Sequence, residues 1–249
     1  MPTSSKIPQI IFEDEFLLCL VKPSGMVVNR AETAKENTLQ DWLEDYFKSK
    51  NQEEVLGEDG LGIGGRAGIV HRLDKETSGV LLVAKTFLSF ENLQLQFKER
   101  KVLKKYLALS HGKVAGKEGI IEADIARNPQ NRRKYGVFLS GRDAKTEFKL
   151  RGYYSKEKEL FSFLEVFPKT GRTHQIRVHL KHIGHPIVSD TVYAGSKRAR
   201  SDRKWCSRLF LHAFSIFFAH PQTGNSLEFK TDLPTDLSSA LSSLRPLQG

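Results

Sequence analysis

Short apolar segments separated by polar or glycine-containing turns recur along most of this 249-residue chain. Several of them have the length and the β-branched or aromatic content that strands favour. We expect strands at residues 10–12, 16–21, 80–84, 106–109, 147–150, 160–167 and 210–219. The run at 80–84 is apolar at every position, which predicts a strand buried on both faces. Turn residues at 220–225, followed by 227–229, predict a hairpin after the last strand.

Helical spacing of apolar residues predicts three helices, at residues 38–49, 87–100 and 171–183. The first begins at Thr38 and has Asp41 three residues later, which is the pattern of a helix cap.

Strands are more numerous than helices along the chain and do not alternate with them. That pattern favours an α+β fold with a large sheet over an alternating βαβ array. We find no internal repeat and no linker, so we expect a flexible arm at 1–9 and a single domain at 10–249. Residues 51–68 hold six glycines without a phosphate-binding pattern, and we expect a mobile loop there.

The charge balance points to a polyanionic partner. The chain has 39 basic and 29 acidic residues, a formal net charge of +10. Nucleic acid is the commonest such partner, and an acidic membrane surface is the alternative. No apolar run approaches the roughly 18 residues that a membrane-spanning helix needs, so we expect no membrane span.

The N-terminal segment and the cysteines favour the cytoplasm. The apolar stretch at 10–12 is too short for a signal peptide. Cys19 and Cys206 are the two cysteines, and they lack the CxxC spacing of metal or redox sites. We expect both to be reduced and buried.

One candidate site lies in the run GIVHRLDKETSGV at 68–80, between an apolar entry and the buried strand. Asp74 lies between Arg72 and Lys75, and neighbouring cations favour the ionised carboxylate. An ionised carboxylate at the edge of a core can act as a nucleophile or a base. A loop of salt bridges in which Asp74 caps a turn is the alternative, and these residues alone favour it.

A second candidate is the run GRTHQIRVHL at 171–180. On the predicted helix, Arg172 shares a face with Ile176, and Thr173 shares a face with Arg177. One face can then pack against the protein while another points cations and amides into a cleft.

Four histidines follow closely in this part of the chain, at 174, 179, 182 and 185. They lack the HExxH spacing, and no cysteine or acid nearby completes a ligand set. Histidines that line RNA or a hydrogen-bonded cleft are therefore favoured over a metal site.

Two clusters of basic residues predict a phosphate-contacting surface. Residues 98–105 carry five cations and one acid, and residues 195–208 carry six cations and one acid. A solvated surface is the alternative reading of both clusters. Tyr106 directly follows the first cluster, and its ring can stack on a base or pack in the core.

These motifs resemble those of the RluA-type RNA pseudouridine synthases. HRLD at 71–74 with TSG at 77–79 is similar to the family's catalytic motif, KYLA at 105–108 to its tyrosine motif, and 171–179 to its arginine motif. Further likeness is found at 22–25, 144–147, 184–187, 190–193 and 211–221. HRLD and GRTHQIR in this order form a highly specific combination, and the likeness extends over nearly the whole chain.

The resemblance implies a pseudouridine synthase fold, a long and mostly antiparallel mixed sheet with flanking helices and a central basic cleft. It also implies the isomerisation of uridine in RNA to pseudouridine. The chemistry demands no redox cofactor, nucleotide or metal, so we expect none.

The resemblance also implies roles for individual residues. Asp74 is the expected essential carboxylate, and Arg177 forms an ion pair that keeps it ionised and aimed. Tyr106 stacks on the target base. Arg72 enters the RNA stack where the uridine is flipped out, a step that costs a few kcal/mol. Substrate contacts are also expected from His71, Arg172, His174 and Gln175.

The chain departs from the family pattern in two places. Members often carry a histidine after the motif at 22–25, whereas this chain reads MVVNR, and we assign no role there. Only about nine residues precede the core, so we expect no N-terminal S4-type domain. RNA choice then rests on the core and on loops such as 51–68 and 195–208. We expect a monomer that acts on ribosomal RNA or transfer RNA.

Two other functions compete with this one. A non-enzymatic RNA-binding factor with the same fold has no need of a carboxylate together with Tyr106 and Arg177. An unrelated glycosidase that uses Asp74 usually requires a second carboxylate across the bond, and neither motif supplies one.

Overall fold

The structure, a computed structural model, describes residues 7–31, 37–52, 55, 62–132 and 134–247. The chain divides into two compact units. Unit 1 comprises residues 1–103 and 215–231, and unit 2 comprises residues 104–214 and 232–249. Within the described residues, no helix is long and apolar enough to cross a membrane.

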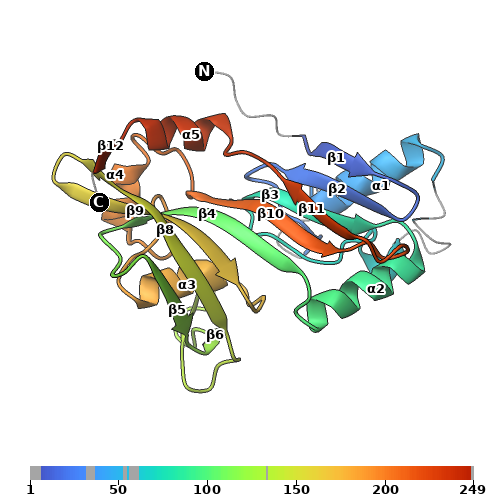
Figure 1. Cartoon of the computed structure of the whole chain (residues 1–249), viewed down its shortest axis with the longest axis horizontal. Helices are drawn as coiled ribbons and strands as arrows, with labels where there is room; N and C mark the ends of the chain where they lie inside the picture. The colour runs from blue at the N-terminus through green and yellow to red at the C-terminus, as the bar shows by residue number, and fades with distance from the viewer. Residues whose placement is uncertain (1–6, 32–36, 53–54, 56–61, 133, 248–249) are drawn as a thin grey trace. The chain divides into compact units, whose positions relative to one another are not determined.

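Unit 1 contains an antiparallel sheet with two helices (Figure 1). Its strands are β1 (Gln9–Glu13), β2 (Leu17–Lys22), β3 (Ser78–Ala84), the end of β10 (Leu211–Ala219) and β11 (Ser226–Lys230). Its helices are α1 (Leu39–Ser49), α2 (Phe87–Lys98) and the short 3-10 turn η2 (Ile63–Gly65). The hairpin of β10 and β11 was predicted and is confirmed.

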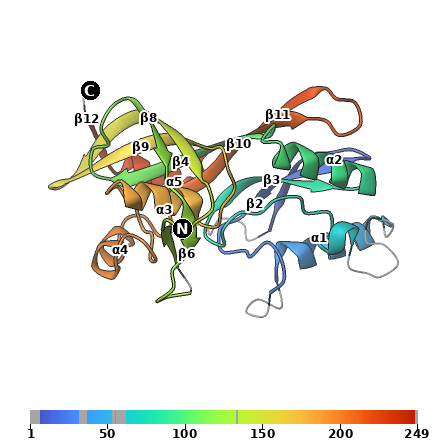
Figure 2. The same cartoon turned by 90° about the horizontal axis from the view of Figure 1, so that it is seen from below.

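Strand β3 is buried at every position, as its apolar sequence predicts. Figure 2 shows α1 and α2 on opposite faces of the strands of unit 1. On one face, Val80 and Leu82 belong to a core cluster with Leu93 of α2. On the other, Leu81 and Val83 are fully buried. Helix α1 begins with the capping box that the sequence predicts.

Unit 2 is built on strands hydrogen-bonded in the order β10-β4-β9-β8-β12, with β5 beside β8 and a separate β6–β7 hairpin. The bounds are β4 (Leu103–His111), β5 (Glu118–Glu122), β6 (Ile125–Arg127), β7 (Tyr135–Val137), β8 (Lys145–Lys156), β9 (Glu159–Pro168) and β12 (Arg245–Leu247). The helices are α3 (Gln175–His182), α4 (Ser196–Asp202) and α5 (Thr235–Ser242). Its core joins side chains of β4 and β9 to apolar residues of α3 and α5.

The predicted fold class is confirmed: the chain is α+β with mostly antiparallel strands. Strands β4 and β8 extend further than the predicted 106–109 and 147–150. Their added residues are largely polar or half-buried, so a prediction from apolar content gave both strands too short. Strands β5, β6, β7 and β12 and helices α4 and α5 were not predicted.

The helix predicted at 171–183 begins later, at Gln175. His174 precedes it in a left-handed conformation, with φ 57°. The predicted helical faces that pair Arg172 with Ile176 and Thr173 with Arg177 are therefore wrong. A left-handed residue does not continue an α-helix, so the helix starts after His174, and before it the Gln175 Oε1 accepts the backbone N–H of Arg172 at 2.9 Å. That bond supports a turn before the helix.

Two predicted segments lie partly outside the described residues. Of the arm expected at 1–9, residues 1–6 are not described, and Gln9 already begins β1. Of the loop expected at 51–68, residues 53–54 and 56–61 are not described, and η2 occupies part of the remainder.

Candidate active site

In unit 1, Asp74 begins a tight turn that leads into β3. The backbone N–H of Thr77 donates to the carbonyl of Asp74 at 3.1 Å and closes the turn. Leu73 and Thr77 are buried, whereas Asp74 is half-buried. The turn therefore holds the Asp74 carboxylate at the edge of the unit 1 core, the place that the sequence predicts.

The segment 22–25 binds the backbone of this turn. Gly25 N–H donates to the carbonyl of Lys75 at 2.8 Å, and the Ser24 hydroxyl donates to the carbonyl of Glu76 at 2.7 Å. Gly25 has φ 89°, a conformation that favours glycine. These contacts fix the two central residues of the turn through their main chain, so they do not depend on the Asp74 side chain.

Lys22 adds a third contact; sequence reasoning included it in the motif at 22–25 but gave it no role. Its side chain is completely buried, and its Nζ donates to the carbonyls of Pro23 (2.8 Å), Met26 (2.9 Å) and Lys75 (3.3 Å). A buried ammonium group is costly unless its protons are bonded, and three carbonyl oxygens meet that need. A lysine at the end of an apolar strand was the available signal.

His71 and Arg72, which precede the turn, lie in different surroundings. His71 Nε2 accepts the backbone N–H of Leu82 at 2.9 Å, and its ring packs 4.8 Å from that of Phe97. Arg72 is exposed. His71 thus has a structural partner in β3, while the Arg72 side chain is accessible to a ligand. Their expected substrate contacts stay predictions.

In unit 2, Arg177 of α3 forms a buried, two-pronged ion pair with Asp190. Arg177 Nε lies 2.8 Å from Asp190 Oδ2, and Nη2 lies 2.9 Å from Oδ1. Arg177 is 5% exposed and Asp190 is 0% exposed. Asp190 Oδ1 also accepts the backbone N–H groups of Val192 and Tyr193. Sequence reasoning gave Asp190 no role, and the ion pair expected between Arg177 and Asp74 stays a prediction.

Tyr193 connects Arg177 to its neighbours. The Arg177 guanidinium lies 5.0 Å from the centre of the Tyr193 ring. The Tyr193 hydroxyl accepts the backbone N–H of Tyr135 at 3.0 Å and lies 2.8 Å from His174 Nδ1. Tyr193 therefore links Tyr135 and His174 to the surroundings of Arg177.

The side-chain amide of Gln175 is hydrogen-bonded within the protein. Its Oε1 accepts from the Thr170 hydroxyl and from Arg172 N–H, and its Nε2 donates to the carbonyl of Lys145 and to the Thr146 hydroxyl. Gln175 is 4% exposed. These bonds favour a positioning role for Gln175, and its expected substrate contact stays a prediction.

Tyr106 lies on β4 opposite Val166 of β9 and is half-buried. Because strand residues two apart share a face, Lys104 lies on the same side of β4 as Tyr106. Burial lowers the pKa of Lys104 to about 8. Lys105 instead lies 3.4 Å from Glu165 and over the Phe214 ring.

The two basic clusters are less uniform than predicted. Lys104 and Lys105 of the first belong to β4 and are partly buried. In the second, Arg208 is 8% exposed and pairs with Asp236 at 2.5 Å, which removes it from the predicted phosphate-contacting surface. The exposed cations of the second cluster are Lys197, Arg198, Arg200, Arg203 and Lys204.

The histidines after 171 have separate surroundings. His179 Nε2 lies 2.9 Å from the carbonyl of Ala123 and Nδ1 lies 2.9 Å from the Thr146 hydroxyl, and burial lowers its pKa. His185 Nδ1 lies 2.8 Å from the carbonyl of His111. Both nitrogens of His179 thus have protein partners.

Across the described ranges, one group has metal-ligand spacing: His111, Glu159 and Asp202. His111 Nε2 lies 3.0 Å from Asp202 Oδ2, which also accepts the backbone N–H of Ser189. The arrangement fits a hydrogen bond that ties α4 to β4.

The chain matches the family model described as RNA pseudouridylate synthase over residues 16–182. It is 37% identical over 242 residues to "Ribosomal large subunit pseudouridine synthase D" of Nitrosomonas europaea, covering 96% of this chain and 66% of that protein. It is 37% identical to "Uncharacterized RNA pseudouridine synthase YlyB" of Bacillus subtilis, covering 95% of this chain and 72% of that protein. About a third of the Nitrosomonas protein therefore lies outside the match.

Among solved structures, the chain resembles "Human RNA Pseudouridylate Synthase Domain Containing 1". The two share 28% identity with a TM-score of 0.75, and the match covers 100% of this chain and 94% of the human one. The likeness in fold therefore extends along the whole chain.

Proposed function

Because this chain belongs to the RNA pseudouridylate synthase family, we propose that it isomerises uridines in RNA to pseudouridine, with Asp74 as the essential carboxylate. In this reaction the bond between N1 of the base and C1′ of the sugar breaks. A bond between C5 and C1′ forms, the C5 proton leaves, and N1 takes up a proton. The reaction is an isomerisation and needs no redox cofactor, nucleotide or metal.

The observation that carries the proposal is the turn at Asp74. Its carboxylate is half-buried, and its backbone is held by the segment 22–25. A catalytic group gains from being fixed before the substrate binds, because orientation is then not lost in the transition state. Partial burial also strengthens the interaction of the carboxylate with developing charge.

The other predicted residues take roles around the flipped uridine. Tyr106 stacks on the target base, and Arg177 pairs with the Asp74 carboxylate in addition to its bond with Asp190. Arg72 is exposed and fills the gap that the extruded uridine leaves in the RNA. His71, Arg172, His174 and Gln175 contact or position the RNA. Both units serve one catalytic domain, residues 10–249.

The proposed substrate is ribosomal RNA of the large subunit. Its support is the 37% identity to a relative named as a large-subunit ribosomal pseudouridine synthase. The net charge of +10 fits a polyanionic substrate. Transfer RNA is the second candidate substrate. We propose that the protein works as a monomer in the cytoplasm.

The test is a map of pseudouridines in total RNA, ribosomal and transfer RNA included, from cells with the gene, cells without it, and cells that carry Asp74→Asn. We expect specific pseudouridines to disappear on deletion, to return with the wild-type gene, and to stay absent with Asp74→Asn. Asp45→Asn is the matched control, because Asp45 is exposed on α1 of the same unit.

Other outcomes would contradict the proposal. Full modification with Asp74→Asn would exclude the carboxylate from the chemistry. An unchanged map after deletion, together with intact RNA affinity of the purified protein, would favour a non-enzymatic RNA-binding factor.

A further inference from the structure

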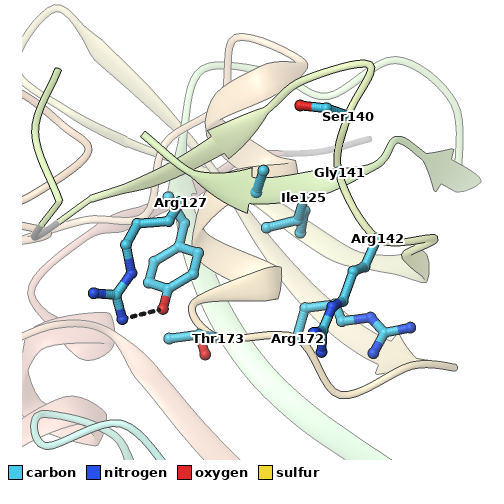
Figure 3. Close-up of a pocket in the computed structure, with 9 residues that line it drawn as sticks. Ile125, Arg127, Ser140, Gly141, Arg142, Arg172 and Thr173 are labelled. Atoms are coloured by element: carbon cyan, nitrogen blue, oxygen red, sulfur yellow. Dashed lines mark hydrogen bonds between the residues drawn. The ribbon is translucent and has the colours of Figure 1, made fainter. Parts of the chain in front are cut away.

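Unit 2 contains a pocket of about 370 Å³ beside the β6–β7 hairpin. Figure 3 shows its walls, which come from the hairpin, from the loop after it and from the turn before α3. Its polar lining includes Arg127, Tyr135, Arg142, Arg172 and Thr173. Three of these five are arginines, so the pocket has a strong positive charge.

Arg172 Nε donates to the carbonyl of Asp143 at 3.0 Å and Arg127 Nη2 donates to the Tyr135 hydroxyl, which leaves their other guanidinium N–H groups for an anion. No carboxylate in the described part of the chain forms an ion pair with Arg127, Arg142 or Arg172. In the view of Figure 3, Arg142 and Arg172 lie toward one end of the pocket and Arg127 toward the other. Guanidinium groups bind phosphate with two parallel hydrogen bonds.

Contacts within unit 2 hold Arg127 and Tyr135 in the wall of the pocket. Arg127 Nη2 donates to the Tyr135 hydroxyl at 3.0 Å, and its guanidinium lies 5.4 Å from the centre of the Tyr135 ring. The backbone N–H of Tyr135 donates to the hydroxyl of Tyr193, whose ring lies under Arg177. The pocket is thus connected to the surroundings of Arg177 by direct contacts within unit 2.

We propose that this pocket is a second RNA contact, which holds one nucleotide of the substrate strand other than the target uridine and binds its phosphate through the arginines. The inference rests on the proposed function, since it names a subsite for the same RNA. A volume of about 370 Å³ exceeds what a phosphate alone occupies and lies in the range of small-ligand pockets. The contact with Tyr193 gives such a nucleotide a fixed position relative to Arg177.

The test compares the Arg127→Gln/Arg142→Gln double variant with the wild-type protein. The probe is transcribed large-subunit ribosomal RNA, with affinity measured by filter binding over a series of salt concentrations. We expect affinity to fall about tenfold, which corresponds to the removal of one charge-assisted hydrogen bond or more. The slope of log affinity against log salt should become shallower by about 0.7 for each phosphate that the variant no longer neutralises.

Arg245→Gln is the matched control, because it removes the same type of charge from an exposed position on β12 of the same unit. If the double variant loses no more affinity than this control and keeps the wild-type salt slope, the proposal is wrong. Circular dichroism should show the same melting temperature for all three proteins, and an Arg127→Lys/Arg142→Lys variant, which keeps the charge, should recover part of the affinity.

Two further measurements distinguish the RNA subsite from a site for a free anion, and failure of the subsite from failure of the catalytic proposal. Inorganic phosphate is added as a competitor, and displacement of the RNA by micromolar phosphate would assign the pocket to a free anion and overturn the RNA subsite. Affinity is measured on the Asp74→Asn background as well. A loss of affinity there supports the pocket even if the chain forms no pseudouridine, so failure of the catalytic proposal is recognised separately.

Discussion

The Asp74 turn in unit 1 and the Arg177 ion pair in unit 2 are held in different ways. The backbone of the Asp74 turn is bound by the segment 22–25, whereas the Asp74 side chain is half-buried at the edge of the core. Arg177 is held through its own guanidinium, which is buried against Asp190 and Tyr193. The first candidate catalytic residue is positioned through its main chain and the second through its side chain.

This difference predicts how substitutions divide between folding and activity. Replacing Asp74 leaves every described contact of residues 22–25 with the turn in place, so activity should fall without a loss of stability. Replacing Arg177 or Asp190 breaks a buried ion pair from one side, so stability should fall first. Activity measurements on Arg177 variants therefore need a measurement of folding beside them.

The largest effect on stability is expected from Asp190→Ala. It removes the carboxylate that pairs with Arg177 and that accepts the backbone N–H groups of Val192 and Tyr193. Breaking a buried pair from one side costs about 3–5 kcal/mol. Urea unfolding measures the loss, with Arg245→Ala, at an exposed position of β12, as the control. A loss below about 1 kcal/mol would mean that the pair does not stabilise unit 2.

A smaller effect is expected from Lys22→Met. The substitution keeps the apolar stem but removes the ammonium that binds the carbonyls of Pro23, Met26 and Lys75. A hydrogen bond to a charged group contributes about 1.5–3 kcal/mol to the free energy of unfolding. We expect a loss of about 2 kcal/mol and reduced activity, because the Asp74 turn loosens.

Lys98→Met, at an exposed position of α2, is the control for Lys22→Met. Equal unfolding free energies for the two variants would show that the buried ammonium does not support the turn.

The smallest effect concerns pH and Lys104. Its pKa is lowered to about 8 by burial from the ordinary value of 10.5. Between these two values the unfolded chain binds more protons than the folded one, so the free energy of unfolding rises with pH through that window. Lys104→Met should lose this rise, and the exposed Lys98→Met should keep it. Identical pH profiles for the two variants, measured by urea unfolding, would contradict the assignment.

The sequence correctly predicted the helices and strands that are determined by residues close together in the chain. The cap at Thr38 sets the start of α1, and the continuous apolar run of β3 reports its burial on both faces. The start of α3 was missed because His174 has a left-handed conformation and the residues before it form a turn in which Gln175 Oε1 accepts the backbone N–H of Arg172. Helical spacing carries no signal for such a bond.

The candidate site was also predictable only in part, because some of its contacts join segments that lie far apart in the chain. Asp74, Tyr106 and Arg177 were found because they lie in motifs that resemble those of a known family. Asp190 and Lys22 also lie in family-like motifs, at 190–193 and 22–25, but they were given no role, because their contacts depend on how the chain packs. The arginine-lined pocket was missed as well, since residues from 125–142 and from 172–173 meet there only in the folded unit.

The most direct test of the central claim is tritium release from RNA labelled at C5 of uridine, measured with purified protein. Pseudouridine formation detaches the C5 proton, so each turnover releases one label. We predict release by the wild-type protein and by Asp45→Asn, and a rate lower by about 10²- to 10⁴-fold for Asp74→Asn at unchanged melting temperature. Release by Asp74→Asn at the wild-type rate would contradict the essential role of this carboxylate.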